Sequence, residues 1–135
     1  MKSNVGHLQI NINPQNFAFY KDLLAFMDWK VIYEDGDTLG MCSEEGPSLW
    51  FSPATKEQPN HYDGIGMNHL GIAVGEEADV DRAVTYLQEH NIPALFGTPR
   101  RRDDFVSDPQ HVYYQVMFET PDKVLVEIVY TGLKQ

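Results

Sequence analysis

The chain is poor in cysteine and in basic residues, and it has no long apolar segment. Its one cysteine, Cys42, has no second cysteine with which to form an internal disulfide, as is common in proteins of a reducing compartment. No apolar run is long enough to cross a membrane, and no charged-then-apolar signal segment opens the sequence. We therefore expect a cytoplasmic protein.

The charge balance limits the partners. Ten Lys and Arg residues stand against 20 Asp and Glu residues, which gives a formal net charge of −10 at pH 7. Such a chain repels phosphate backbones and anionic membrane surfaces. With 135 residues, 42% hydrophobic and 22% charged, the sequence is typical of one folded domain. We expect a small-molecule partner and exclude nucleic acid and membranes.

The most informative feature is a repeat. Residues 6–12 (GHLQINI) and residues 68–74 (NHLGIAV) both alternate apolar and other residues, and both have a histidine at the second position. Each segment predicts a half-buried strand. His7 and His69 lie 62 residues apart in the sequence, and we expect them to occupy related positions in the fold and to face one shared cavity.

The segments after each histidine strand continue the repeat. Residues 16–27 have apolar side chains at helical spacing, and residues 80–87 repeat this apolar face after an acidic helix start at residues 76–79. Three strands are expected after each helix, at residues 30–33, 39–42 and 48–51 and at residues 94–96, 112–118 and 124–130. We predict an α+β fold of two βαβββ modules in a single domain of residues 1–135, with module one at about 1–52, a linker at about 53–66 and module two at about 67–133.

A third conspicuous residue is Glu127, in the last apolar strand. Burying a carboxylate there is costly without a cation or a hydrogen-bond donor. Two histidines and one carboxylate are a typical metal-ligand set. We therefore predict that His7, His69 and Glu127 hold a divalent metal ion. The alternative is that both histidines are core residues and that an arginine, either Arg82 or one of residues 100–102, neutralises Glu127.

These segments resemble the vicinal oxygen chelate superfamily, which includes glyoxalase I, bleomycin and fosfomycin resistance proteins and extradiol dioxygenases. The resemblance rests on residues 7–10, 19–24, 69–74 and 113–128 and covers almost the whole chain. It implies that the two modules pair into a half-open curved sheet, the glyoxalase/bleomycin resistance/dioxygenase fold. The substrate would chelate the metal through adjacent oxygens, and His7, His69 and Glu127 match the ligand positions of the family.

The sequence departs from the glyoxalase I pattern at one position. Superposing the two modules places Trp50, to within one residue, where Glu127 stands, so the fourth ligand of glyoxalase I, a glutamate, is missing. The remaining set resembles the facial triad of extradiol dioxygenases, which suits Fe(II), and Zn- or Mn-binding members are also compatible. A homodimer is expected. The family pairs modules within one chain or across two chains, so the site could lie within one chain, or His7 and His69 could belong to sites that a partner chain completes.

Other residues are candidates for substrate handling. Tyr113 and Tyr114 are consecutive in a strand and point to opposite faces, so one of them should enter the cavity as a catalytic hydrogen-bond or proton donor. His111 is a candidate acid or base at the cavity mouth. The candidate substrate-binding residues are Trp50, Phe51 and Arg101. Arg101 belongs to a loop at residues 98–110 that is expected over the cavity edge.

We therefore expect a metal-dependent enzyme of the glyoxalase or extradiol dioxygenase type, either a dioxygenase or a lyase or isomerase. The alternative is a non-catalytic small-molecule binding protein of the bleomycin-resistance type, favoured by the acidic charge and the aromatic candidates. A third reading is a protein that keeps the fold and has lost its chemistry.

Overall fold

The computed structural model describes residues 1–135. The chain forms two compact units, Met1–Pro59 and Asn60–Gln135. Each unit contains one four-stranded sheet and one α-helix. No helix in the structure combines the length and the apolar character needed to cross a bilayer.

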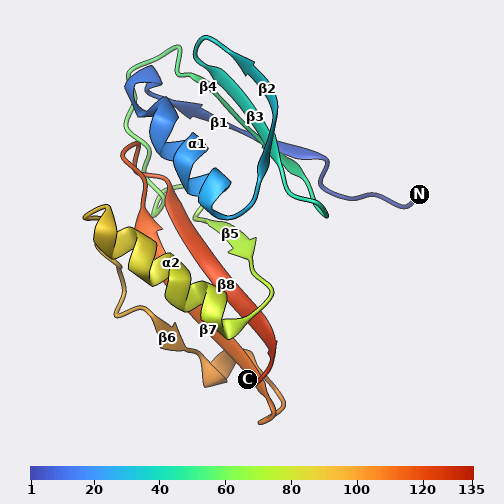
Figure 1. The fold of residues 1–135 in the computed structure, drawn as a ribbon. Helices are drawn as coiled ribbons and strands as arrows, with labels where there is room; N and C mark the ends of the chain where they lie inside the picture. Colours follow the sequence, from blue (N-terminus) through green and yellow to red (C-terminus); the bar gives the residue numbers. More distant parts are fainter. The chain divides into compact units, whose positions relative to one another are not determined.

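The first unit is built in the order strand, helix, three strands (Figure 1). Its elements are β1 (His7–Ile12), the 3-10 turn η1 (Pro14–Asn16), α1 (Phe17–Phe26), β2 (Lys30–Asp35), β3 (Thr38–Cys42) and β4 (Ser48–Pro53). The strand order is β1-β4-β3-β2, with β1 parallel to β4 and the other pairs antiparallel. The parallel pair requires a long crossover, which α1, β2 and β3 provide.

The second unit repeats this topology. Its elements are β5 (Leu70–Ala73), α2 (Glu77–Glu89), β6 (Arg100–Arg101), η2 (Asp103–Phe105), β7 (His111–Glu119) and β8 (Leu125–Leu133). The order β5-β8-β7-β6 again has the first strand parallel to the last. The two βαβββ modules and the α+β class predicted from the sequence repeat are confirmed.

In the first unit, strand pairing separates a helix face from an open face, which we define as the face of a sheet turned away from the helix of its own unit. Phe51 of β4 packs on Tyr20 of α1 with ring centroids 4.5 Å apart, which identifies the helix face. The buried apolar residues of this face are Ile10, Ile12, Leu39, Met41, Leu49 and Phe51. The opposite parity of β1 and β4 places His7, Gln9, Asn11, Ser48 and Trp50 on the open face.

In the second unit, the same division follows from a hydrogen bond. The Tyr114 hydroxyl of β7 donates to Asp81 of α2 at 2.6 Å, so Tyr114 lies on the helix face. The core of this face also contains Val112, Val116, Phe118, Val126 and Ile128, with Val80, Ala83 and Leu87 from α2. The open face carries Arg100, Tyr113, Gln115, Met117 and Glu127. Tyr113 and Tyr114 point to opposite faces, as predicted.

One predicted strand is wrong. Residues 94–96 form no strand, because Phe96 has φ +56° and Gly97 has φ +67°, which an extended strand does not allow. The strand that pairs with β7 is β6, a few residues later, inside the segment that was expected to be a loop. The rest of that segment contains the η2 turn. Apolar composition alone misplaced this strand, since β6 consists of two arginines.

Candidate functional site

The site is built around Glu127, a buried carboxylate in the first half of β8. Its neighbours along the chain at residues 124–126 and 128–130 are all buried and apolar or aromatic, and Glu127 itself is 4% exposed. In the sheet Glu127 lies between Gly71 of β5 and Met117 of β7. Because Gly71 has no side chain, nothing from β5 covers the carboxylate on the open face. The strand thus holds a charge that requires polar partners.

Two side chains from other elements satisfy this carboxylate. The Tyr113 hydroxyl donates to Glu127 Oε1 at 2.7 Å, and His69 Nε2 lies 3.2 Å from Glu127 Oε2. His69 directly precedes β5, so the parallel pairing of β5 with β8 brings its ring to the carboxylate. Three of the residues selected from the sequence therefore meet on the open face of the second unit.

The orientation of the His69 ring restricts its chemistry. His69 Nδ1 lies 2.7 Å from Asn68 Oδ1, and the Asn68 amide nitrogen donates to the Tyr62 carbonyl at 3.0 Å. With this amide assignment Asn68 offers only an acceptor, so Nδ1 carries a proton. Nε2 is then the ring nitrogen that faces Glu127 Oε2, and with Nδ1 protonated it is the nitrogen that could bind a metal ion.

Tyr113 is held as a neutral hydrogen-bond donor. Burial, together with the hydrogen bond to Glu127 and the nearby Glu127 charge, raises the pKa of Tyr113 to about 12. Phe105 packs edge-on against its ring, with centroids 5.1 Å apart. Tyr113 therefore keeps its proton near neutral pH and directs it at the carboxylate.

The first unit places His7 at the position equivalent to His69. In β1, His7 stands two residues before Gln9, which pairs with Trp50; in the second unit, His69 stands two residues before Gly71, which pairs with Glu127. The register thus makes Trp50 the counterpart of Glu127. His7 is exposed on the open face of its own unit.

Trp50 forms an aromatic surface on that open face. A Cβ atom at Gly40 would lie 3.0 Å from three atoms of the indole ring, so only a glycine allows the ring to lie so close over β3. The indole N–H donates to Ser48 Oγ at 2.9 Å, and the Tyr33 ring lies 5.6 Å away. The neighbouring candidate, Phe51, is 2% exposed and lies on the helix face.

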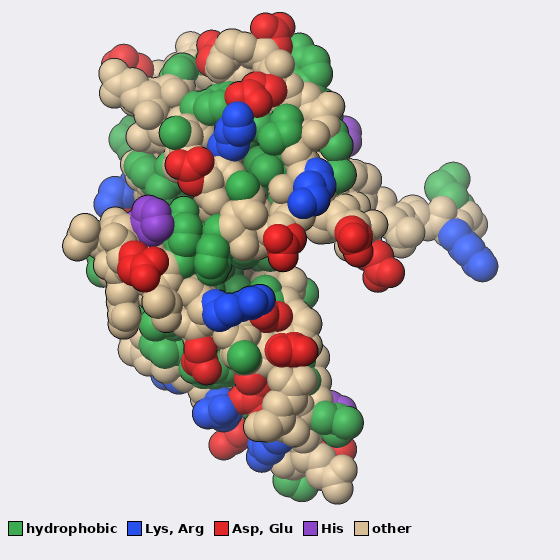
Figure 2. All heavy atoms as spheres, viewed as in Figure 1, with side chains coloured by type: hydrophobic (Ala, Val, Ile, Leu, Met, Phe, Trp, Pro, Cys, Tyr) green, Lys and Arg blue, Asp and Glu red, His purple; other side chains and the backbone are tan.

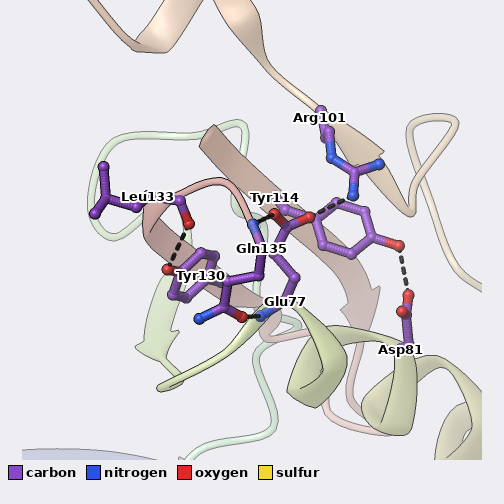
Figure 3. A network of polar contacts seen from close by, with 7 residues as sticks. All are labelled: Glu77, Asp81, Arg101, Tyr114, Tyr130, Leu133 and Gln135. Atoms are coloured by element: carbon purple, nitrogen blue, oxygen red, sulfur yellow. Dashed lines mark hydrogen bonds and ion pairs between the residues drawn. The ribbon is translucent and has the colours of Figure 1, made fainter. Parts of the chain in front are cut away.

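The remaining candidates lie away from Glu127. Arg101 forms an ion pair with Glu77 and lies over the Tyr114 ring on the helix face, 4.7 Å from its centroid (Figure 3). The pKa of Tyr114 is raised to about 12 by burial and by its hydrogen bond to Asp81. His111 begins β7 and pairs with Asp108 at 3.1 Å. Neither Arg101 nor Tyr114 faces the carboxylate, and Arg82 pairs with Asp79.

Sequence reasoning missed Asn68 near the site and considered Arg102 only as one of the possible arginine partners of Glu127. Asn68, which orients His69, was part of the repeat but drew no attention because its partner in the other module is a glycine, Gly6. Arg102 lies over the Phe105 ring at 3.9 Å and donates its backbone N–H to the Tyr113 carbonyl at 2.8 Å. Consecutive side chains of an extended segment point to opposite sides, and this rule could have indicated that Arg101 and Arg102 face different sides of the sheet.

The donor set fits part of a metal site. Two ligands at right angles on an ion with bonds of about 2.1 Å are roughly 3.0 Å apart, close to the 3.2 Å between His69 Nε2 and Glu127 Oε2. No group of three or more His, Cys, Asp or Glu side chains in residues 1–135 is arranged to hold an ion. The second unit alone thus offers two ligands.

Comparison with known proteins identifies the family. The model of the Glyoxalase/Bleomycin resistance protein/Dioxygenase superfamily matches residues 5–128. Solved structures of this fold include a proposed glyoxalase from Bacillus halodurans, with 24% identity, a TM-score of 0.75 and coverage of 93% of this chain and 94% of that chain. A glyoxalase/dioxygenase from Nostoc punctiforme has 18% identity, a TM-score of 0.70 and coverage of 96% and 91%.

A lactoylglutathione lyase from Agrobacterium tumefaciens has 16% identity, a TM-score of 0.66 and coverage of 96% of this chain and 95% of that chain. No curated protein sequence is similar enough to be matched. At these identities the solved structures establish the fold, while the family model, which covers most of the chain, establishes the membership. The chain belongs to the glyoxalase/bleomycin resistance protein/dioxygenase superfamily.

Proposed function

We propose that the protein is a metal-dependent enzyme in which His69 and Glu127, completed by His7, hold a divalent ion. The substrate is a small molecule with two adjacent oxygens that chelate this ion. The metal would act as a Lewis acid and as a template for the bound substrate. Fe, Mn and Zn all suit a His and carboxylate set.

The observation that supports this proposal most strongly is the contact between His69 Nε2 and Glu127 Oε2 at 3.2 Å. Because Asn68 fixes the proton on Nδ1, the nitrogen facing the carboxylate is the one available to a metal. Glu127 is buried at 4% exposure among apolar strand neighbours, and a metal ion would supply the positive charge that favours a carboxylate there.

The chain's own residues suggest two roles beside the ion. Tyr113 holds the second carboxylate oxygen by its hydrogen bond at 2.7 Å and so fixes the direction of the first. Trp50 occupies the position where a second glutamate would otherwise stand, which leaves coordination positions for substrate. Oxygen-dependent ring cleavage is favoured by such an open three-ligand site, while lyase or isomerase chemistry is the alternative; the identity of the metal selects between them.

Elemental mass spectrometry of untagged protein, purified without added metal, tests this function. We expect about one Fe, Mn or Zn ion per chain in the unchanged protein and its loss in His69→Ala and in His7→Ala. His111→Ala is the matched control, because His111 pairs with Asp108 away from Glu127, and it should keep the metal. Metal content that is equal in all four proteins would refute the ligand assignment.

A second candidate function is non-catalytic binding of a planar, cationic small molecule. The specific support is the ring of Trp50, which lies flat over Gly40 beside Tyr33 on the open face, in a chain of net charge −10. Titration of chelator-stripped protein with a planar cationic dye, followed by tryptophan emission, separates the two functions. Tight binding without metal, lost in Trp50→Ala, would favour the binding protein.

We further propose that the protein acts in the cytoplasm as a homodimer, with the two modules of each chain forming a single domain. Sedimentation velocity at several protein concentrations tests the assembly. A single monomeric species at all concentrations would contradict it.

A further inference from the structure

The three consecutive arginines at residues 100–102 lie in different surroundings. Arg101 points to the helix face, where it pairs with Glu77 (Figure 3). Arg100 pairs in register with Gln115, which shares the open face with Tyr113 and Glu127. Because side chains alternate along a strand, Arg100 lies on the side opposite to Arg101. Arg102 directly follows β6 and lies over the Phe105 ring, which packs against Tyr113 of the open face. Two of the three cations therefore belong to the face of the candidate site.

Arg102 is held by contacts within the chain. Its guanidinium lies over the Phe105 ring at 3.9 Å, and Phe105 in turn packs against Tyr113. Asp104 accepts from Nε at 2.8 Å and from Nη2 at 2.6 Å. This contact uses two of the five N–H groups of the side chain, which leaves three for a ligand. With 23% of its side chain exposed, Arg102 is half-buried yet accessible.

Arg100 has no ion-pair partner within the chain. Its charge acts on Asp104, whose pKa is lowered to about 2 mainly by the hydrogen bonds from Arg102 and to a smaller extent by Arg100. Asp104 therefore neutralises one of two arginines, and the second charge remains available beside it. An uncompensated cation on the face of a binding site is a common anchor for a carboxylate.

We propose that Arg100 and Arg102 together bind a carboxylate group of the substrate, at the edge of the open face that holds His69, Glu127 and Tyr113. This inference rests on the proposed function. There the adjacent oxygens at one end of the substrate bind the ion, and here the two arginines bind a carboxylate at its other end. The substrate class is thereby a small hydroxy or oxo acid with one carboxylate beyond its chelating end.

The charge distribution favours a small acid over a polyanion. On the side of the sheets that carries the helices, acidic and basic side chains are interspersed without a broad basic patch (Figure 2). A net charge of −10 opposes the approach of a nucleic acid, whose binding needs many cations along its backbone. Two arginines suffice for a single carboxylate, which takes a bidentate hydrogen bond from one guanidinium and charge from the other.

Calorimetric titration with lactate and malate tests the inference. Both probes present a hydroxyl and a carboxylate as adjacent oxygens, and malate adds a second carboxylate. Titrations are run at low ionic strength, with metal-loaded and with chelator-stripped protein, since screening weakens exposed charge contacts. In the unchanged protein we expect malate to bind at least about tenfold more tightly than lactate. The reason is that the second carboxylate of malate would accept hydrogen bonds from the charged arginines, and such bonds are stronger than those between neutral groups.

The variants isolate the two arginines. Arg100→Gln combined with Arg102→Gln should reduce the preference for malate to about twofold or less. Arg101→Gln, one residue away on the other face, is the matched control and should keep the preference. Arg102→Lys, which keeps the charge, should retain part of it. Circular dichroism verifies that each variant is folded, and Arg102→Lys keeps the test valid if the double variant unfolds.

Each outcome bears on one proposal or the other. The carboxylate site is overturned if the unchanged protein does not prefer malate, or if the double variant prefers malate as strongly as the unchanged protein does. It is also overturned if neither metal-loaded nor chelator-stripped protein binds malate detectably. Protein that binds a metal ion but shows no malate preference keeps the proposed function and loses this inference. Protein that binds no metal but keeps an arginine-dependent preference refutes the metal site alone.

Discussion

Glu77 provides a quantitative test of the polar network between α2 and the end of the chain. Glu77 is 6% exposed, and its carboxylate accepts hydrogen bonds from the backbone N–H of Gln135 at 3.0 Å and from Arg101. In return the Glu77 N–H donates to the Gln135 side chain at 3.0 Å (Figure 3). These donors lower the pKa of Glu77, the Gln135 N–H first and then Arg101 against the opposing effect of burial.

The cost of replacing this charge follows from its contacts. Hydrogen bonds to a charged group contribute about 1.5–3 kcal/mol each, while an exposed ion pair contributes less than about 1 kcal/mol. The Arg101 side chain is 54% exposed, so its contribution belongs to the lower range. Glu77→Gln keeps the shape and one acceptor oxygen. We expect it to lower the free energy of unfolding by about 2 kcal/mol near neutral pH.

The effect depends on pH in a defined direction. A carboxylate whose pKa is lower in the folded than in the unfolded chain stabilises the fold above its ordinary pKa, 4.5 for Glu77, and this contribution disappears as the pH falls through the folded value. The difference between the unchanged protein and Glu77→Gln should therefore be largest near pH 7 and should shrink toward about pH 3. Urea unfolding followed by circular dichroism measures it.

The control is Glu89→Gln, an acid-to-amide change at an exposed position near the end of the same helix. It should change stability by less than about 0.5 kcal/mol at every pH. A difference for Glu77→Gln that stays constant from about pH 7 to pH 3, or that matches the control, would refute the reasoning.

Two further substitutions test the two units separately. Gly40→Ala should displace the Trp50 ring, shift the tryptophan emission and destabilise the protein by about 1 kcal/mol, whereas Gly6→Ala, which meets nothing within 4 Å, should leave the emission unchanged; equal spectra would contradict the close approach. Tyr113→Phe should lower the free energy of unfolding of chelator-stripped protein by about 1–2 kcal/mol, because Glu127 loses its donor. A stability equal to that of the unchanged protein would argue against this hydrogen bond.

The sequence repeat predicted most of the topology because strand and helix periodicity are local properties. His7 and His69 begin equivalent segments, and the helices and most strands follow at matching distances. The register then makes Trp50 the counterpart of Glu127, as superposing the two modules had indicated. Tyr113 and Tyr114 separated to opposite faces for the same reason, since alternation is a property of any extended strand.

Prediction from the sequence failed where the structure depends on which face of a strand a residue occupies or on the local backbone conformation. The apolar residues 94–96 were taken as a strand, but φ values above zero at Phe96 and Gly97 end any strand there. Arg101 was chosen among three arginines, and a shift of one residue moves a side chain to the other face. The strand β6 consists of two arginines and therefore has no apolar pattern in the sequence. Its strand conformation comes from its pairing with β7.

The central claim, that Glu127 and its partners hold a divalent ion, is tested most directly by metal affinity. Competition of the protein with a chelator gives the metal dissociation constant for the unchanged chain, for Glu127→Gln and for the control His111→Gln. The account predicts that Glu127→Gln weakens binding at least about 100-fold, roughly 2.7 kcal/mol, while the control stays within about threefold. Equal affinities in all three proteins would contradict it.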